Sequence, residues 1–113
     1  MRPDQETLTD VVRACRLIVE FSAGLDRERF LGDLKTQSSV VHQLLVLGEA
    51  AKRLSARFRE LHRDLPWSAM AGMRDKLIHA YDEVDLEEVW RTAEIDIPNI
   101  LRRLGSIVPP NDE

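Results

Sequence analysis

One short segment of the chain concentrates side chains that can perform acid–base chemistry on a phosphate. It contains Arg74, Asp75, His79 and Tyr81. An imidazole exchanges protons near neutral pH, so His79 can take the proton of a ribose 2′-hydroxyl or protonate a leaving oxygen. A guanidinium can bind a phosphate through two parallel hydrogen bonds and stabilise its transition-state charge. These residue types predict RNA cleavage with the 2′-hydroxyl as nucleophile, which requires no metal ion.

Helical geometry divides these side chains between two faces. Arg74 and Tyr81 are seven residues apart and share one face, whereas Asp75 and His79 are four apart and share an adjacent face. Arg74 and His79 are five residues apart and therefore point roughly 140° away from each other on one helix. The pair of a single chain is poorly arranged to grip one phosphate, so the spacing favours a site that a second chain completes.

The elements that carry this segment are predicted to be helices throughout. Helical periodicity covers almost the whole chain, and alternation typical of strands appears nowhere over a useful length. We therefore expect an all-α protein. A first helix is expected over residues 4–23, with Asp4 as its N-cap and Gly24 as its stop. A short helical turn is expected over residues 26–32.

A second, long helix is expected after the polar residues 35–39. Its apolar residues recur at spacings of four and three, which suits packing in a bundle, and Gly48 on the same helix allows close helix approach. These apolar residues are Val40, Leu44, Leu47, Ala51 and Leu54. Residues 63–67 interrupt the pattern, and a third helix over residues 67–79 carries the Arg74 to Tyr81 segment.

The last helix has the clearest start in the chain. Asp85 is expected as its N-cap and Glu88 as the partner in a capping box. Pro98 lies inside this helix, so a kink is expected near residues 94–98. Four main helices with short links predict an up-down bundle of four to five helices.

Size and composition indicate one domain over residues 1–113, with a core over roughly residues 4–105 and a flexible tail at residues 106–113. Cys15 is the only cysteine, which excludes a disulfide within one chain and fits a cytoplasmic location. The longest apolar run spans residues 44–47, far short of the ~20 residues of a membrane span. We therefore expect no membrane association and no export.

The net charge of −4 is unevenly distributed. Residues 82–96 carry seven acids against Arg91 alone, a local charge of −6. This balance argues against tight coating of nucleic acid, so any RNA contact must be local. Five basic residues form either a solvated helix face or a path for RNA, with the first three as candidate RNA contacts: Lys52, Arg53, Arg57, Arg59 and Arg63. The acidic segment is likewise either a solvated face or a docking surface for a basic partner.

The spacing of Arg74, His79 and Tyr81 resembles the Arg-x4-His-x-Tyr motif of HEPN-domain toxins of the HepT type. Residues 41–55 (VHQLLVLGEAAKRLS), residues 65–67, residues 71–73 and residues 84–90 also resemble that family, so the resemblance covers roughly residues 5–105. It implies a HEPN fold and a homodimer whose two motifs form a composite RNase site without a cofactor. It also implies a minimal nucleotidyltransferase antitoxin of the MntA type as partner, which silences the toxin by transferring AMP to the motif tyrosine, here Tyr81.

The chain departs from many members of that family at Asp75, where they carry asparagine. A carboxylate one turn before His79 favours the imidazolium and orients the ring, but it also repels a phosphate. Our hypothesis is that Asp75 supports His79 as the acid. Two other functions stay open: a binding module that holds nucleotide or RNA without cleavage and engages a nucleotidyltransferase, and a purely structural dimerisation bundle.

The remaining candidates have simpler interpretations. His42 and His62 have no second ligand-type neighbour at metal spacing, so no metal site is predicted. Trp67 and Trp90 are expected as core or interface anchors, with base stacking as an alternative for Trp67. Cys15 is expected as a small buried apolar residue. Tyr81 could cap the core instead of accepting AMP.

Overall fold

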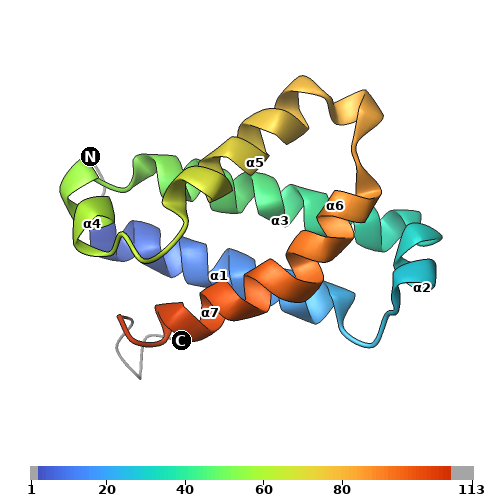
Figure 1. Cartoon of the computed structure of the whole chain (residues 1–113), viewed down its shortest axis with the longest axis horizontal. Coiled ribbons are helices and arrows are strands. Elements are labelled where there is room, and N and C mark those ends of the chain that lie inside the picture. The colour runs from blue at the N-terminus through green and yellow to red at the C-terminus, as the bar shows by residue number, and fades with distance from the viewer. Residues whose placement is uncertain (1–2, 108–113) are drawn as a thin grey trace.

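The computed structural model describes residues 3–107, and their regular elements are all helical, as the periodicity predicts. Figure 1 shows α1 and α3 running alongside each other, α5 on the other side of α3, and the last helical stretch crossing α1. The long elements are α1 (Asp4–Ser22), α3 (Leu34–Arg53), α5 (Trp67–His79) and the stretch of α6 (Leu86–Arg91), η2 (Thr92–Asp96) and α7 (Ile97–Leu104). The short elements are α2 (Arg27–Leu31), α4 (Ala56–Leu61) and η1 (Tyr81–Glu83). The fold is a helical bundle in which α3 contacts both α1 and α5.

The prediction that Asp4 is the N-cap of the first helix is wrong. Pro3 occupies the N-cap position in extended conformation, and Asp4 is already helical. The Asp4 carboxylate instead accepts hydrogen bonds from the backbone N–H of Ser55, at 2.9 Å, and from its hydroxyl, at 2.6 Å. These two bonds lower the pKa of Asp4 and tie the start of α1 to the end of α3. The expected stop is present, since Gly24 has a left-handed φ of 78° just beyond the helix.

The second long helix begins earlier than predicted, because Asp33 caps it. Its carboxylate accepts a hydrogen bond from the backbone N–H of Thr36 at 3.0 Å, so α3 includes the polar residues 35–39. Gln37 in that stretch is buried, and its amide donates to the carbonyls of Phe30 and Leu31 at 2.9 and 3.0 Å. The polar start of α3 therefore anchors α2, which forms where the short turn was predicted.

The same helix also ends earlier than the sequence pattern indicates. Leu54 leaves the helical conformation with a ψ of 142°, and Ser55 caps a separate helix, α4, by accepting from the N–H of Phe58 at 3.0 Å. Arg57 and Arg59 therefore lie on α4 rather than on the outer face of one long helix. A serine N-cap competes with helix continuation because its side chain satisfies a backbone donor of the following turn.

The last helix starts at the predicted cap, and a π turn lies where the kink was predicted. The Asp85 carboxylate accepts from the N–H of Glu88 at 3.2 Å, but the Glu88 side chain binds Lys76 at 2.8 Å instead of completing a capping box. Thr92–Asp96 forms a π turn, in which the N–H of Ile97 donates to the Thr92 carbonyl. Pro98 has no N–H to donate, so the wider turn just before it accommodates the disturbed hydrogen bonding.

The core lies between α1, α3 and the last helical stretch, and it includes Cys15, which is fully buried as predicted. Burial raises the pKa of the Cys15 thiol to about 12. Trp67 is only 5% exposed and its indole N–H donates to the His62 carbonyl at 2.9 Å, which leaves no free ring face for base stacking. Trp90 packs against Phe30, with ring centroids 5.3 Å apart. Most of the predicted tail, residues 108–113, lies outside the described residues.

None of the helices in residues 3–107 is both long enough and apolar enough to cross a membrane.

Candidate active site

Arg74 is positioned by the close approach of α3 and α5, which Gly48 makes possible. A Cβ atom at Gly48 would lie 2.2 Å from the Arg74 Cβ and 2.7 Å from the Met70 carbonyl oxygen. Real Cβ atoms do not approach other heavy atoms so closely. The expectation of close approach at Gly48 is therefore confirmed, and the contact lies directly beside the motif arginine.

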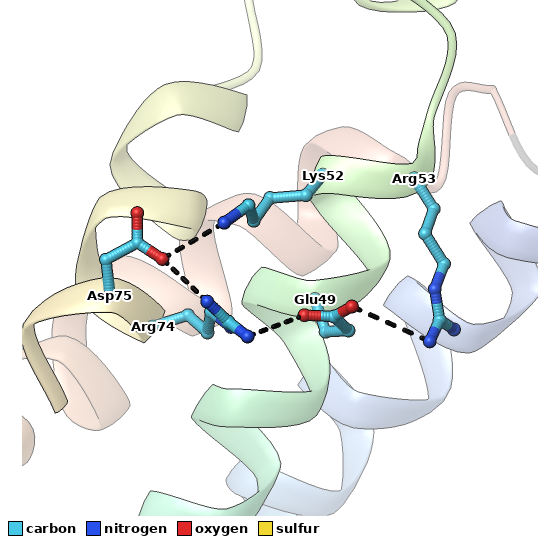
Figure 2. Close-up of polar contacts among 5 residues, drawn as sticks. All are labelled: Glu49, Lys52, Arg53, Arg74 and Asp75. Carbon is cyan, nitrogen blue, oxygen red and sulfur yellow. Dashed lines mark hydrogen bonds and ion pairs between the residues drawn. The ribbon is translucent and has the colours of Figure 1, made fainter. Parts of the chain in front are cut away.

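A chain of ion pairs connects the facing sides of α3 and α5, as Figure 2 shows. Arg74 donates to Asp75 Oδ1 at 2.9 Å through one terminal nitrogen, and its other terminal nitrogen lies 3.1 Å from Glu49 Oε1. Lys52 Nζ lies 3.2 Å from the same Asp75 oxygen, and an Arg53 nitrogen lies 3.6 Å from Glu49 Oε2. We call these five residues the α3–α5 network. Its three cations and two carboxylates leave one net positive charge.

The network holds the Arg74 guanidinium in one orientation without using all of its donors. A guanidinium has five N–H groups in a rigid plane, and two of its nitrogens are occupied by carboxylates here. The side chain is 27% exposed, so part of it is accessible to solvent. Arg74 is therefore held in one orientation, and some of its N–H groups are not used by the two carboxylates.

The hydrogen bond from Arg74, followed by the one from Lys52, lowers the pKa of Asp75 below its ordinary value of 3.8. Both bonds favour the charged carboxylate. Because the pKa of Asp75 is lower in the folded state than in the unfolded state, the ionised carboxylate makes a favourable contribution to folding stability at pH values above the unfolded-state pKa. It is lost as the pH falls through the folded-state pKa. Asp75 is therefore ionised at neutral pH.

Replacing Lys52→Gln is expected to raise the pKa of Asp75 toward its ordinary value but not fully, because the Arg74 hydrogen bond remains. The titration of the Asp75 side-chain carboxyl, followed by carbon NMR, measures this change. Lys35→Gln, in the exposed first turn of the same helix, is the matched control and should leave the Asp75 midpoint in place. An unmoved midpoint in Lys52→Gln would show that the Lys52 contact is not maintained in solution.

A groove of about 320 Å³ opens beside the network. Arg74, Glu49 and Arg53 line it together with apolar side chains, of which Ile78 is 43% exposed. The remaining lining residues are Asp10, Leu45, Val46 and Ala50. The groove therefore combines a fixed guanidinium with an apolar surface.

His79 lies at the exposed last residue of α5 and does not line this groove. In the described part of the chain, no hydrogen bond joins it to Asp75, whose Oδ1 is shared by Arg74 and Lys52. Within one chain the structure thus brings Arg74 and Asp75 together but leaves His79 apart from them. Tyr81 follows in the short helix η1, and its side chain is outside the described part.

The predicted basic path is divided between two helices. Lys52 and Arg53 belong to the network, whereas Arg57 is exposed on α4 and Arg59 is partly buried there. Within residues 3–107, no group of three histidine, cysteine or acidic side chains is arranged to hold a metal ion.

Glu49 is the site residue that sequence reasoning missed. It bridges Arg74 and Arg53, and its side chain is 41% exposed. The available signal was its position next to Gly48 and four residues before Arg53, a spacing typical of an ion pair on one helix. That signal indicates the Arg53 pair but not the contact with another helix.

The family described as Ribonuclease HepT-like matches residues 11–107. The chain is 44% identical to "Probable ribonuclease HepT" of Thermococcus cleftensis over 99 residues, which cover 88% of this chain and 90% of the relative.

Two further relatives are named as candidate RNases. One, from Caldanaerobacter subterraneus, is 34% identical, with 96% of each chain covered. The other, from Methanocaldococcus jannaschii, is 36% identical, with 94% of this chain and 91% of the relative covered. No solved structure matches the chain. The family match spans most of the residues that build the bundle and all of the α3–α5 network, and the chain therefore belongs to the HepT-like ribonuclease family.

Proposed function

We propose that this protein is a metal-independent endoribonuclease, the toxin of a toxin–antitoxin pair, with Arg74 and His79 as its catalytic residues. The observation that carries the proposal is the α3–α5 network, which orients Arg74 at the mouth of a groove and leaves donors for a phosphate. Membership of the HepT-like ribonuclease family supports RNA as the substrate class.

The chemistry follows from the side chains. Arg74 binds the scissile phosphate and stabilises the charge that develops on its oxygens. His79 transfers a proton, either from the 2′-hydroxyl or to the departing 5′-oxygen. Attack of the 2′-oxygen on phosphorus forms a cyclic phosphate and breaks the bond to the 5′-oxygen. Asp75 and Glu49 act as positioning residues, because they contact the guanidinium on its two sides.

The active form is proposed to be a homodimer in which Arg74 of one subunit works with His79 of the other. Two observations support this. Arg74 faces α3 beside the groove, whereas His79 lies outside the groove at the helix end. Ile78 is an exposed apolar side chain between them in sequence, and it lines the groove with Leu45 and Val46. Apolar residues beside a site that one chain does not complete suit a subunit interface.

Lys52, Arg53 and Arg57 are proposed to guide the RNA backbone to this site. Lys52 and Arg53 lie in the network beside Arg74, and Arg57 is exposed on the following helix. Their positive charge is confined to one region of the surface, so it is compatible with the net charge of −4 of the whole chain. We also propose that the protein acts in the cytoplasm, since its proposed substrate is cellular RNA.

Cleavage of an RNA oligonucleotide in excess chelator is expected to leave a 2′,3′-cyclic phosphate and a free 5′-hydroxyl. Replacing the single ribose at the cleavage position by 2′-deoxyribose removes the nucleophile, so cleavage there should stop, while a 2′-deoxy substitution several positions away should have no effect. Mass spectrometry of the fragments reads both results. RNA that is bound but never cleaved under these conditions would favour the non-catalytic binding module instead.

Tyr81 is proposed as the acceptor of AMP from a minimal nucleotidyltransferase of the MntA type. Adenylate adds a bulky negative group two residues from His79, so it should obstruct RNA and inhibit cleavage. Intact-mass analysis after co-expression with a neighbouring nucleotidyltransferase is expected to show added AMP in the wild type and none in Tyr81→Phe. AMP that persists in Tyr81→Phe would place the acceptor at another residue.

A further inference from the structure

Two cations from different helices meet at one oxygen atom, Asp75 Oδ1. A terminal nitrogen of Arg74 on α5 lies 2.9 Å from this oxygen, and Lys52 Nζ of α3 lies 3.2 Å from it, as Figure 2 shows. The two nitrogens can be no farther apart than the sum of these distances, and one phosphate can bridge that separation with its two non-bridging oxygens. Carboxylates and phosphates both accept charge-assisted hydrogen bonds from lysine and arginine. Asp75 therefore marks a position where the protein already holds an anionic group.

This position is accessible from solvent and lies beside the groove rather than in it. The side chains of Lys52 and Asp75 are 42% and 46% exposed. Figure 2 shows Asp75 and Glu49 on opposite sides of the Arg74 guanidinium, and of these two carboxylates it is Glu49 that lines the groove. A phosphate in place of the Asp75 carboxylate would therefore contact Arg74 from the side opposite Glu49.

The two cations differ in how firmly they are held. In residues 3–107, the ion-pair partner of Lys52 is Asp75 alone, whereas Arg74 also contacts Glu49 at 3.1 Å. An ammonium group carries three donors on a flexible stem, so Lys52 can turn from Asp75 to a phosphate. Arg74 stays oriented by Glu49 when its contact with Asp75 is exchanged for one with a phosphate. The arrangement thus allows one anion to replace another without loss of the Arg74 position.

We infer that Lys52 and Arg74 hold one phosphate of bound RNA between them, and that Asp75 occupies this position when RNA is absent. The inference rests on the proposed function in taking this phosphate as the scissile one. Lys52 is then a catalytic residue, because it stabilises the charge that develops on the non-bridging oxygens together with Arg74. Arg53 has a different role, since it contacts Glu49 on the other side of Arg74 and attracts RNA without touching this phosphate.

Binding is measured by fluorescence anisotropy at several salt concentrations, with a single-stranded 2′-O-methyl oligonucleotide that lacks the nucleophile. Lys52→Gln should weaken binding about fivefold or more and lower the salt dependence by about one released counterion. Asp75→Asn removes the competing charge but keeps an acceptor for Arg74, so it should tighten binding about fivefold. Lys35→Gln makes the same charge change in the exposed first turn of α3 and should bind like the wild type.

The cleavage rate at saturating RNA distinguishes a phosphate ligand from a charge that only attracts RNA. Lys52→Gln should lower this rate about tenfold or more, whereas Arg53→Gln should mainly raise the RNA concentration needed for saturation. Because Lys52 also contacts Asp75, the decisive comparison is made in the Asp75→Asn background. There Lys52→Gln should still weaken binding and lower the rate. Circular dichroism checks that each variant is folded.

Three results would overturn the inference: wild-type binding by Lys52→Gln, an unchanged rate at saturating RNA, or an effect of Lys52→Gln that vanishes in the Asp75→Asn background. The last result would mean that Lys52 acts only through Asp75. Failure of the proposed function gives a different result. The wild-type protein would then bind the oligonucleotide through Lys52 but cleave no RNA, which leaves Lys52 and Arg74 as a phosphate-binding site.

Discussion

His79→Ala is expected to reduce the rate of RNA cleavage by about 10²- to 10⁴-fold, the range for loss of a positioned acid–base group. The side chain is exposed at the last residue of α5, so its removal should leave the thermal unfolding temperature nearly unchanged. Gel assays of a labelled RNA in excess chelator, together with a thermal melt, measure the two quantities. The expected result is a large loss of activity in a protein that is as stable as the wild type.

His42→Ala provides the matched control, because His42 is an exposed histidine on α3 that does not line the groove beside the α3–α5 network. It should cleave RNA at the wild-type rate. If both variants retain full activity, the acid–base role does not belong to His79. If both lose activity equally, the effect is not specific to the site.

Mixing two inactive variants tests whether the site is shared between subunits. In a dimer formed from Arg74→Ala and His79→Ala subunits, one composite site retains both residues, whereas a site within one chain retains only one of them. Co-refolded mixtures should therefore recover about a quarter of wild-type activity, since half of the dimers are mixed and each has one intact site of two. No recovery, in mixtures shown to exchange subunits, would contradict the composite site.

Gly48→Ala is expected to have the second large effect, on both stability and cleavage. The added methyl group meets the Arg74 Cβ and the Met70 carbonyl, so α3 and α5 must move apart. Overpacking of this kind costs about 1–3 kcal/mol, which the higher helix propensity of alanine offsets by about 1 kcal/mol. Displacement of Arg74 should also lower the cleavage rate. Urea unfolding and initial cleavage rates measure the two effects.

Gly72→Ala is the control for this substitution, since Gly72 lies on α5 and a Cβ atom there meets nothing within 4 Å. The same change in helix propensity should then stabilise the protein by up to about 1 kcal/mol, with cleavage unchanged. The change in the free energy of unfolding is therefore expected to have opposite signs for Gly48→Ala and Gly72→Ala. Equal stabilisation at both would mean that α3 and α5 separate at no cost and that Gly48 does not position Arg74.

Much of the fold follows from local sequence signals, and the failures have separate causes. Periodicity predicted α5 to its first and last residues, and the Asp85 cap was correct because an N-cap bond is made within one turn. The Asp4 cap failed because a residue far along the chain, Ser55, competes for the same carboxylate. The break at Leu54 was missed because the apolar spacing continues through it.

The candidate site was likewise predicted only in part. The residue types and spacing of Arg74 and His79 are properties of one helix, and the sequence displays them directly. The partners of Arg74 are different, because Glu49 and Lys52 reach it only after α3 and α5 have packed at Gly48. Periodicity indicates that two helices meet but not their rotation about their own axes, and this rotation selects which surface charges become neighbours.

The π turn at Thr92–Asp96 keeps the same face of the last helical stretch buried before and after the turn. Val89, Ala93 and Ile97 follow each other at intervals of four residues, and each is at most 1% exposed. In an uninterrupted α-helix, eight residues rotate the buried face by about 80° relative to two full turns, which would carry Ile97 off the core. The wider turn absorbs that excess. It therefore takes up one more residue than an α-helical turn does, and the helices on either side keep the same buried face.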